Sequence, residues 1–277
     1  MKTLYITDMD CTFLNNDGVV SEKSKKLINE LSENGVLFSV ATARSIMSAG
    51  GLLDGVKISA PAVLMSGVFV YDIENKRAVK FFSLDEDTFN KVLSIFDAHK
   101  KSPFVFFYDS RNDEFSIEFT CLRLQVHKDF YSARKLLLGD KIRQVDYVAL
   151  KDFACPVFLS LCDEYEDLLP VTKELDEIEA VGYSFYKDTY TKYWFLEVFN
   201  REASKAKGLE IVKAYTGADR AVAFGDNLND IPLFSAADEC YAVKNAVGKL
   251  KEIATGIIDE NEKDGVAMFI YEREKSR

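Results

Sequence analysis

The sequence predicts an α/β fold in which a doubly wound parallel sheet is interrupted by an inserted α+β region, and three observations support this prediction. Residues 4–41 read as strand, helix and strand, which is the pattern of a βαβ unit with parallel strands covered on both faces. The alternation of helices and strands resumes after Phe199. Between these stretches, aromatic strands mix with helices, as is typical of a separate α+β unit with its own core.

The first part of the sheet begins with the strand formers at 4–7. Ser21 can cap the helix that follows, and Asn34-Gly35 can end it in a left-handed conformation. The next strand, at 36–41, is almost continuously apolar, as expected for a strand buried on both faces. A further short strand is expected at 62–65.

We place the insertion at 84–190 and a discontinuous core at 1–83 and 191–277. For the middle of the chain, the patterns predict helices over 85–98, 129–138 and 164–175, and strands over 104–108, 115–119, 157–161, 180–186 and 193–198. For the last part, they predict helices over 205–215, 231–236 and 247–254, and strands over 221–224 and 239–243.

The composition excludes several classes of function. No apolar run reaches the length of a membrane span and no signal-peptide pattern opens the chain, so we expect a cytoplasmic protein with no membrane partner. The formal net charge is −10 and no basic stripe is present, which argues against a nucleic-acid partner. The five cysteines are odd in number and lack CxxC spacing, so we expect reduced thiols.

Polar residues follow four predicted elements of the core. Asp8 and Asp10 come directly after the first strand, where two carboxylates could serve as a nucleophile beside a proton shuttle or as ligands of a hard cation. The others are Thr42 with Arg44 after the second strand, Lys205 at the start of a helix, and the run Gly225-Asp226-Asn227-Leu228-Asn229-Asp230. Because ligands bind outside the carboxyl ends of strands in open α/β sheets, we expect these groups to converge.

Four aspartates in one crevice repel one another unless cations are present. The chain has only two histidines and no cysteine cluster, so the expected ion is Mg²⁺, held by Asp8, Asp10, Asp226 and Asp230. With the ion bound, a phosphate dianion could approach, and Lys205 and the Thr42 hydroxyl would supply further donors.

The order of these motifs resembles the haloacid dehalogenase superfamily of phosphohydrolases: DxDxT at 8–12, Thr42, Lys205, then GDxxND at 225–230. The insertion between Thr42 and Lys205 resembles the type IIB cap of the Cof-like phosphatases in position and length. The segment 261–266, with the sequence NEKDGV, is similar to the closing motif of that group.

The resemblance implies a role for each matching residue. Asp8 would attack phosphorus, and Asp10 would protonate the leaving oxygen and then activate water. Thr42 and Lys205 would bind the transferring phosphoryl group. Asp226 would bind Mg²⁺ with Asp8 and the backbone carbonyl of Asp10. Asn229 and Asp230 would complete the metal and phosphate surroundings, Asp230 through Lys205 or a water. Arg44 would be either a substrate contact or a structural ion pair.

The chain departs from the family pattern at several positions. Cys11 and Ala43 stand where glycine is usual, Ser66-Gly67 stands where Asn-Gly is common, and Lys205-Ala206 replaces Lys-Gly. Lys207 is a second candidate for the cationic position. Residues two apart face different sides of a helix, so only one of the two lysines can enter the site, and we favour Lys205.

These observations together predict a Rossmann-like core with an inserted cap and a Mg²⁺-dependent phosphatase. Its substrate would be a small phosphorylated metabolite, such as a sugar phosphate or a phosphorylated cofactor, hydrolysed through an aspartyl-phosphate. Two alternatives remain: a phosphosugar mutase or other phosphotransferase, which would need a second phosphate site in the insertion, and a catalytically silent ligand sensor, which would be expected to lose Asp8, Asp10 or Lys205.

Overall fold

The structure is a computed structural model that describes residues 2–188 and 191–276, and its contacts divide the chain into two compact units. The first unit combines Met1–Lys80 with Ser204–Arg277, and the second is Phe81–Ala203. No helix among the described residues is long and apolar enough to cross a membrane.

Both boundaries of the second unit differ from those we expected: the unit begins at Phe81 and not at residue 84, and its end differs more. The expected end of the insertion, residue 190, lies outside the described residues, and the unit continues to Ala203. The reason is β11 (Trp194–Asn200), which pairs antiparallel with both β9 (Cys155–Asp163) and β10 (Val181–Lys187). This strand therefore belongs to the sheet of the second unit and not to the core.

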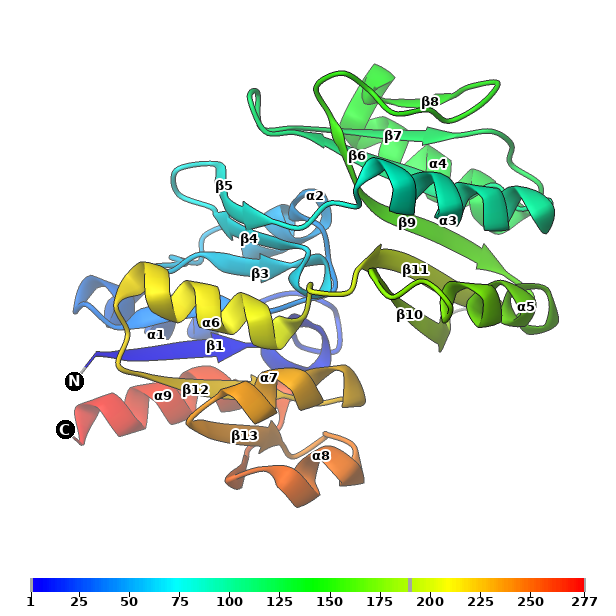
Figure 1. Cartoon of the computed structure of the whole chain (residues 1–277). Helices are drawn as coiled ribbons and strands as arrows, with labels where there is room; N and C mark the ends of the chain where they lie inside the picture. The colour runs from blue at the N-terminus through cyan, green and yellow to red at the C-terminus, as the bar shows by residue number, and fades with distance from the viewer. Residues whose placement is uncertain (1, 189–190, 277) are drawn as a thin grey trace. The chain divides into compact units, whose positions relative to one another are not determined.

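The first unit is built on a parallel sheet of five strands in the order β14-β13-β12-β1-β2 (Figure 1). The chain runs from β1 to β2 on one side and later returns to β12 on the other, which confirms the doubly wound α/β core. The strand order reverses between β1 and β12, the position where ligands bind in such sheets. The strands are β1 (Thr3–Thr7), β2 (Leu37–Val40), β12 (Arg220–Gly225), β13 (Glu239–Val243) and β14 (Gly256–Ile258).

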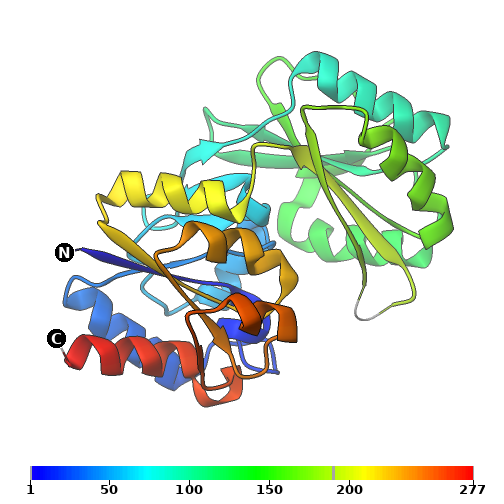
Figure 2. The same cartoon turned by 60° about the horizontal axis from the view of Figure 1, so that its bottom comes forward.

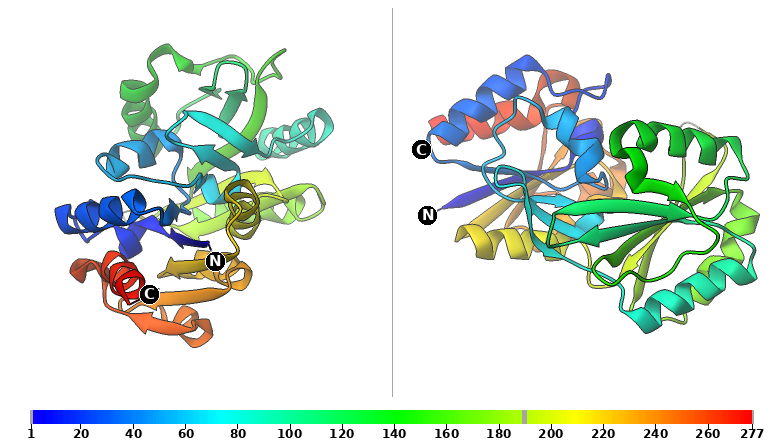
Figure 3. Two further views of the ribbon diagram at one scale, coloured as in Figure 1. Left: turned by 90° about the vertical axis from the view of Figure 1, so that its left-hand side faces the viewer. Right: turned by 90° about the horizontal axis from the view of Figure 1, so that it is seen from above.

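Helices cover both faces of this sheet. On one face α1 (Glu22–Glu33) packs against α9 (Gly265–Lys275), and on the other α6 (Lys205–Thr216) packs against α7 (Ile231–Ala236) (Figures 1 and 3). The short helix α8 (Gly248–Ile253) follows β13. Burial on both faces explains why β1 and β2 are buried along their whole length.

A small second sheet extends the first unit beyond β2. It contains the expected strand β3 (Ala62–Leu64) and two strands that we did not expect, β4 (Phe69–Asp72) and β5 (Arg77–Phe81). A parallel bridge between Ala41 and Val63 connects this sheet to the end of β2. The chain between β2 and β3 forms the short helix α2 (Ile46–Ala49).

The second unit is a six-stranded sheet in the order β10-β11-β9-β6-β7-β8, mostly antiparallel, with β7 and β8 parallel. Its helices α3 (Glu86–Ala98) and α4 (Gln125–Leu138) lie on opposite sides of the sheet (Figure 2). Side chains alternate along β6, so Phe107 packs with Phe89 of α3 while Phe104 stacks on Phe130 of α4, with ring centroids 4.3 Å apart. The other elements of this unit are β6 (Phe104–Asp109), β7 (Glu114–Phe119), β8 (Ile142–Gln144) and α5 (Tyr165–Leu175).

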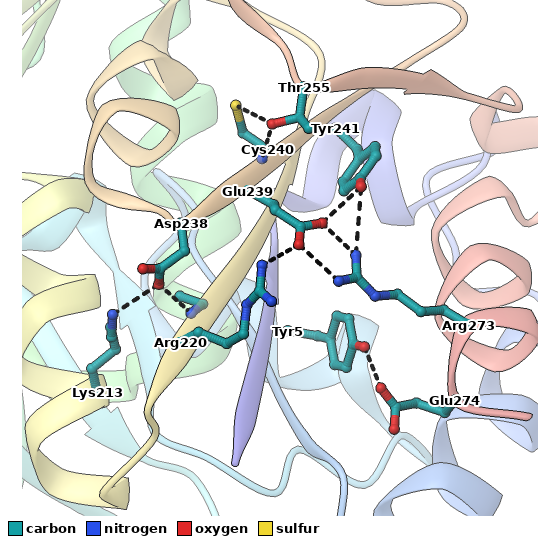
Figure 4. A network of polar contacts seen from close by, with 11 residues as sticks. Tyr5, Lys213, Arg220, Asp238, Glu239, Cys240, Tyr241, Thr255, Arg273 and Glu274 are labelled. Atoms are coloured by element: carbon teal, nitrogen blue, oxygen red, sulfur yellow. Dashed lines mark hydrogen bonds and ion pairs between the residues drawn. The ribbon is translucent and has the colours of Figure 1, made fainter. Parts of the chain in front are cut away.

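An ion-pair network ties α9 to the amino-terminal ends of β12 and β13 (Figure 4). Glu239 accepts hydrogen bonds from Arg220 and from Arg273, whose Nη2 lies 2.8 Å from Glu239 Oε1. Tyr5 donates to Glu274 at the same place. The hydrogen bonds from Arg273 are the main reason that the pKa of Glu239 is lowered to about 2.

We predict that Glu239→Gln lowers the free energy of unfolding by about 1–2 kcal/mol at pH 7, a value reduced for screening by solvent. The pKa of Glu239 is about 2 in the folded protein against an ordinary value of 4.5, so the unfolded state binds more protons between those values. The stabilisation is therefore complete above about pH 5 and is lost as the pH falls toward 2.

Urea unfolding at pH 7 and pH 3 measures this effect, with Glu252→Gln at an exposed position of α8 as the control. A difference between wild type and Glu239→Gln that does not shrink at pH 3 would contradict the role of the charge.

Candidate active site

The polar residues predicted from the sequence gather at the carboxyl ends of β1 and β12. The Asp8 backbone N–H donates to the carbonyl of Phe224, 2.9 Å away, so the last residues of the two strands are fixed side by side. On the other side of β1, the Ala41 N–H donates to the Thr7 carbonyl at 2.8 Å and holds the segment that contains Thr42. The adjacent ends of three parallel strands thus bring together residues from both ends of the chain.

Lys205 is the centre of the site. Its Nζ lies 2.6 Å from Asp8 Oδ1 and 2.6 Å from Asp230 Oδ1. The three side chains are almost completely buried, with exposed fractions of 2% for Lys205, 6% for Asp8 and 0% for Asp230. Lys207, the second candidate, forms an exposed ion pair with Glu210. The structure therefore places Lys205, and not Lys207, beside Asp8.

Burial is the main control on the pKa values of these carboxyl groups, and repulsion between them adds to it because they outnumber the cation. Burial raises the pKa of Asp8 well above its ordinary value, and Asp230 adds to the shift although Lys205 opposes it. Burial and the neighbouring Asp230 raise the pKa of Asp226 to about 6. Burial disfavours the charge on Lys205, but Asp8 and Asp230 outweigh that cost and raise its pKa. One ammonium is shared by three acidic groups, so the site favours an additional cation.

The geometry of the acidic group fits such a cation. One oxygen each from Asp8, Asp226 and Asp230 can be chosen so that all lie within 4.8 Å of one another. Carboxylate oxygens are the ligands that hard divalent ions prefer. The side chain of Asp10 lies outside this group, because it is turned toward Arg44.

Asp230 also organises the loop that contains Asp226. Its Oδ2 accepts the backbone N–H groups of Asp226 at 3.0 Å and Asn227 at 3.2 Å, while Oδ1 accepts from Lys205. A Cβ atom on Gly225 would lie 2.6 Å from Asp230 Oδ2, so the glycine is needed for this close approach. Asp230 therefore acts both as the acid that caps the loop and as a partner of the buried lysine.

Asp10 has a different environment from Asp8. Both of its oxygens are bound by Arg44, whose Nε lies 2.8 Å from Oδ2 and whose Nη2 lies 2.6 Å from Oδ1. The Asp10 side chain is 52% exposed. From the sequence, Arg44 could be either a substrate contact or a structural ion pair. In the structure it forms an ion pair with Asp10.

The loop after Asp8 is held by residues to which we assigned no role. Cys11 stands where glycine is usual, and its φ of +56° is the left-handed backbone conformation that residues other than glycine seldom adopt. The side chain of Asn245 donates to the Cys11 carbonyl at 2.7 Å, and its Oδ1 accepts the backbone N–H of Asn261. Thr12 donates to Asp226 Oδ1 at 3.2 Å. The position of Asn245, just after β13, was the one feature of the sequence that could have indicated its place near the site.

The two remaining predicted residues lie at different depths. Thr42 is buried, and its hydroxyl accepts the backbone N–H of Arg44 at 3.1 Å. Asn229 is exposed on the single turn at Leu228–Asp230. Thr42 is therefore a fixed part of the site wall, whereas Asn229 lies at its surface.

Known proteins resemble this chain over almost its whole length. The family model described as haloacid dehalogenase-like hydrolase matches residues 5–270. The 5-amino-6-(5-phospho-D-ribitylamino)uracil phosphatase YitU of Bacillus subtilis (strain 168) is 24% identical over 97% of this chain and 96% of its own. Phosphatase YwpJ of the same organism is 22% identical over 96% of this chain and 98% of its own.

Solved structures share the fold. A haloacid dehalogenase-like hydrolase from Bacteroides thetaiotaomicron superposes with a TM-score of 0.76 at 20% identity, covering 99% of this chain and 100% of that one. A sugar phosphatase of HAD subclass IIB superposes with a TM-score of 0.70 at 16% identity, covering 99% of each chain. At these identities the likeness concerns the fold.

We predict that Asp230→Ala lowers the free energy of unfolding by about 3–5 kcal/mol, because it leaves a buried ammonium with one partner fewer and two backbone N–H groups without their acceptor. Urea unfolding followed by circular dichroism measures the loss. The single tryptophan lies in the second unit and would report that unit instead. Asp54→Ala, at an exposed position of the first unit, should change the free energy by less than about 0.5 kcal/mol. A loss below about 1 kcal/mol for Asp230→Ala would contradict the organising role.

Proposed function

The chain belongs to the haloacid dehalogenase-like hydrolase family and is a phosphoric monoester hydrolase, and from this premise we propose that it is a Mg²⁺-dependent phosphatase of small metabolites that acts through an aspartyl-phosphate on Asp8. The observation that carries the proposal is the buried contact of Lys205 with Asp8, next to Asp226 and Asp230. A buried carboxylate beside a fixed cation, at the switch point of a parallel sheet, suits attack on a phosphate ester.

Asp8 is the proposed nucleophile. Lys205 binds its Oδ1, so we assign the attack on phosphorus to the other oxygen. The new bond from Asp8 to phosphorus forms as the bond from phosphorus to the ester oxygen breaks, and Asp10 gives that oxygen its proton. Water then attacks the aspartyl-phosphate, Asp10 takes a proton from the water, and inorganic phosphate leaves with Asp8 restored.

The phosphoryl oxygens need donors that do not move during the reaction. Lys205 supplies a buried ammonium, and Thr42 supplies a hydroxyl on a segment fixed by the backbone of β1. Asn229, at the surface of the site, is assigned to the substrate side. Arg44 orients Asp10 through two hydrogen bonds, and Asp10 must leave this pair to reach the leaving oxygen. Such positioning accounts for much of phosphoryl-transfer catalysis.

Mg²⁺ is the proposed cofactor. Asp8 and Asp226 would hold it with the backbone carbonyl of Asp10, and Asp230 would support them from behind through Lys205. When bound, the ion would supply the positive charge that the carboxylates lack and offset the charge of a phosphate dianion. The feature of this chain that favours the ion is the grouping of three carboxyl groups, Asp8, Asp226 and Asp230, beside the single ammonium of Lys205.

The proposed substrate is a small phosphorylated metabolite, either a sugar phosphate or a phosphorylated cofactor precursor. Two relatives support this range: one is named a phosphatase of 5-amino-6-(5-phospho-D-ribitylamino)uracil and another a sugar phosphatase. The unit Phe81–Ala203 is the proposed cap domain of type IIB. All five cysteines are unpaired, which supports the proposed cytoplasmic location.

We predict Mg²⁺-dependent phosphate release from at least one member of a panel of hexose phosphates, pentose phosphates and phosphorylated ribitylaminouracil. Release should stop in EDTA. Asp8→Asn should lower kcat/KM by a factor of roughly 10⁴ or more, because it removes the nucleophile. Asp17→Asn, at an exposed turn nearby, should leave it unchanged. Wild-type protein that releases no phosphate from any panel member in Mg²⁺ would count against the phosphatase, and transfer between sugars would then be measured.

We also predict that Asp226→Asn raises the free energy of unfolding by about 1–2 kcal/mol at pH 7.5 in EDTA. The pKa of Asp226 is about 6 in the folded protein against an ordinary value of 3.8, so the folded state binds more protons than the unfolded state between these pH values. Wild type therefore loses stability as the pH rises from about 4 to 6.

Excess Mg²⁺ should stabilise wild type, by about 2.7 kcal/mol at a concentration one hundred times Kd, and should stabilise the Asp226→Asn variant much less. Equal stabilisation of both proteins by Mg²⁺ would exclude Asp226 as a ligand.

A further inference from the structure

The turn Met65–Gly67, between β3 and β4, has an unusual backbone. Three consecutive residues have positive φ angles: +50° at Met65, +56° at Ser66 and +106° at Gly67. Non-glycine residues adopt this conformation only rarely, and two in succession cost free energy. Strain of this kind persists where the surrounding structure enforces it, and it concentrates at functional sites.

One side of the turn holds the segment that follows β2. The Met65 N–H donates to the carbonyl of Arg44 at 3.0 Å, and the Ser66 N–H donates to the carbonyl of Thr42 at 3.0 Å. The positive φ angles at Met65 and Ser66 accompany this arrangement, in which two successive N–H groups bind the same segment. The turn therefore fixes the backbone of the residue proposed to bind phosphate, Thr42.

The other side of the turn touches the start of α6. A Cβ atom on Gly67 would lie 2.2 Å from the carbonyl oxygen of Ser204 and 2.6 Å from its nitrogen. Ser204 is the N-cap of α6, and its hydroxyl accepts the N–H of Lys207 at 3.0 Å. The residue after it is Lys205. The backbone of Gly67 thus lies directly against the peptide that carries the buried lysine.

We propose that the turn Met65–Gly67 is a positioning element that sets the place of Lys205 and Thr42 relative to Asp8. Neither Ser66 nor Gly67 needs to touch the substrate for this role. Contact of the Gly67 backbone with Ser204 determines how far α6 enters the site, and the two N–H groups fix the opposite wall. The inference rests on the proposed function, because Lys205 and Thr42 are its phosphate-binding groups.

Gly67→Ala tests the proposal. The added methyl group must push α6 outward, and a displacement of about 1 Å lowers kcat/KM by roughly 100-fold. Gly217→Ala is the matched control: this glycine ends the same helix with φ +64°, and a Cβ there meets nothing within 4 Å. The Gly217→Ala variant also places alanine at a positive φ, but its added methyl group meets no neighbouring atom. We therefore expect it to lower Tm but to leave kcat/KM within about threefold of wild type.

A double mutant distinguishes positioning of Lys205 from general damage. If Gly67 acts through Lys205, adding Gly67→Ala to Lys205→Ala should change the residual kcat/KM by less than about threefold, because residues that act together are not additive. A second loss of roughly 100-fold in that background would overturn the proposal. So would a folded Gly67→Ala enzyme with kcat/KM within threefold of wild type.

Two further measurements keep the test decisive. If Gly67→Ala does not fold, Ser66→Val replaces it: a β-branched residue disfavours positive φ, so activity should fall, whereas Ser66→Asn, which tolerates that conformation, should retain it. Equal activity of the two Ser66 variants would overturn the proposal.

If wild type releases no phosphate, the proposed function has failed, and the crystal structure of Gly67→Ala then tests this inference by itself. The distance from Lys205 Nζ to Asp8 Oδ1, which is 2.6 Å in wild type, should increase. An unchanged distance would overturn the inference.

Discussion

The Lys205 ammonium lies almost completely buried between Asp8 and Asp230, and the rest of the core is arranged around this triad. Burying charges is costly, and attraction between them repays the cost only when the geometry is good and the remaining polar atoms are satisfied. Here Asp230 meets that condition by accepting two backbone N–H groups with its second oxygen. The remaining negative charge is not balanced, so a site that is held together by one cation still favours another.

The parallel sheet makes this triad possible. Asp8 follows β1 and Asp226 follows β12, and these strands are neighbours at the point where the strand order reverses. Helices on both faces keep water from the strands, so their ends are fixed with little freedom. At those ends glycine allows the closest approaches: Gly225 against Asp230, and Gly67 against Ser204. The absence of a side chain at these two positions is therefore part of how the site is built.

Much of the core and its charged groups could be predicted from the sequence, because their signals are local. Apolar strands, helix caps and a carboxylate at a strand end can be read within a few residues, and the predicted residues Asp8 and Lys205 do meet. The boundary at Ala203 could not be read in this way, because it depends on the pairing of β11 with β9 and β10. Contacts between distant residues were missed for the same reason, such as that of Asn245 with the carbonyl of Cys11.

The two carboxylates of the first motif illustrate what only three dimensions provide. Asp8 and Asp10 are identical residues two positions apart, yet one is buried against Lys205 and the other is half-exposed against Arg44. Such a difference in environment is how proteins give paired acids different tasks. A buried carboxylate fixed by a lysine is suited to attack, because it has few water molecules to lose. A half-exposed carboxylate, paired with an arginine, is suited to carry a proton between the leaving group, water and solvent. On the proposed function, the division of labour between Asp8 and Asp10 thus follows from their difference in burial and in cationic partner.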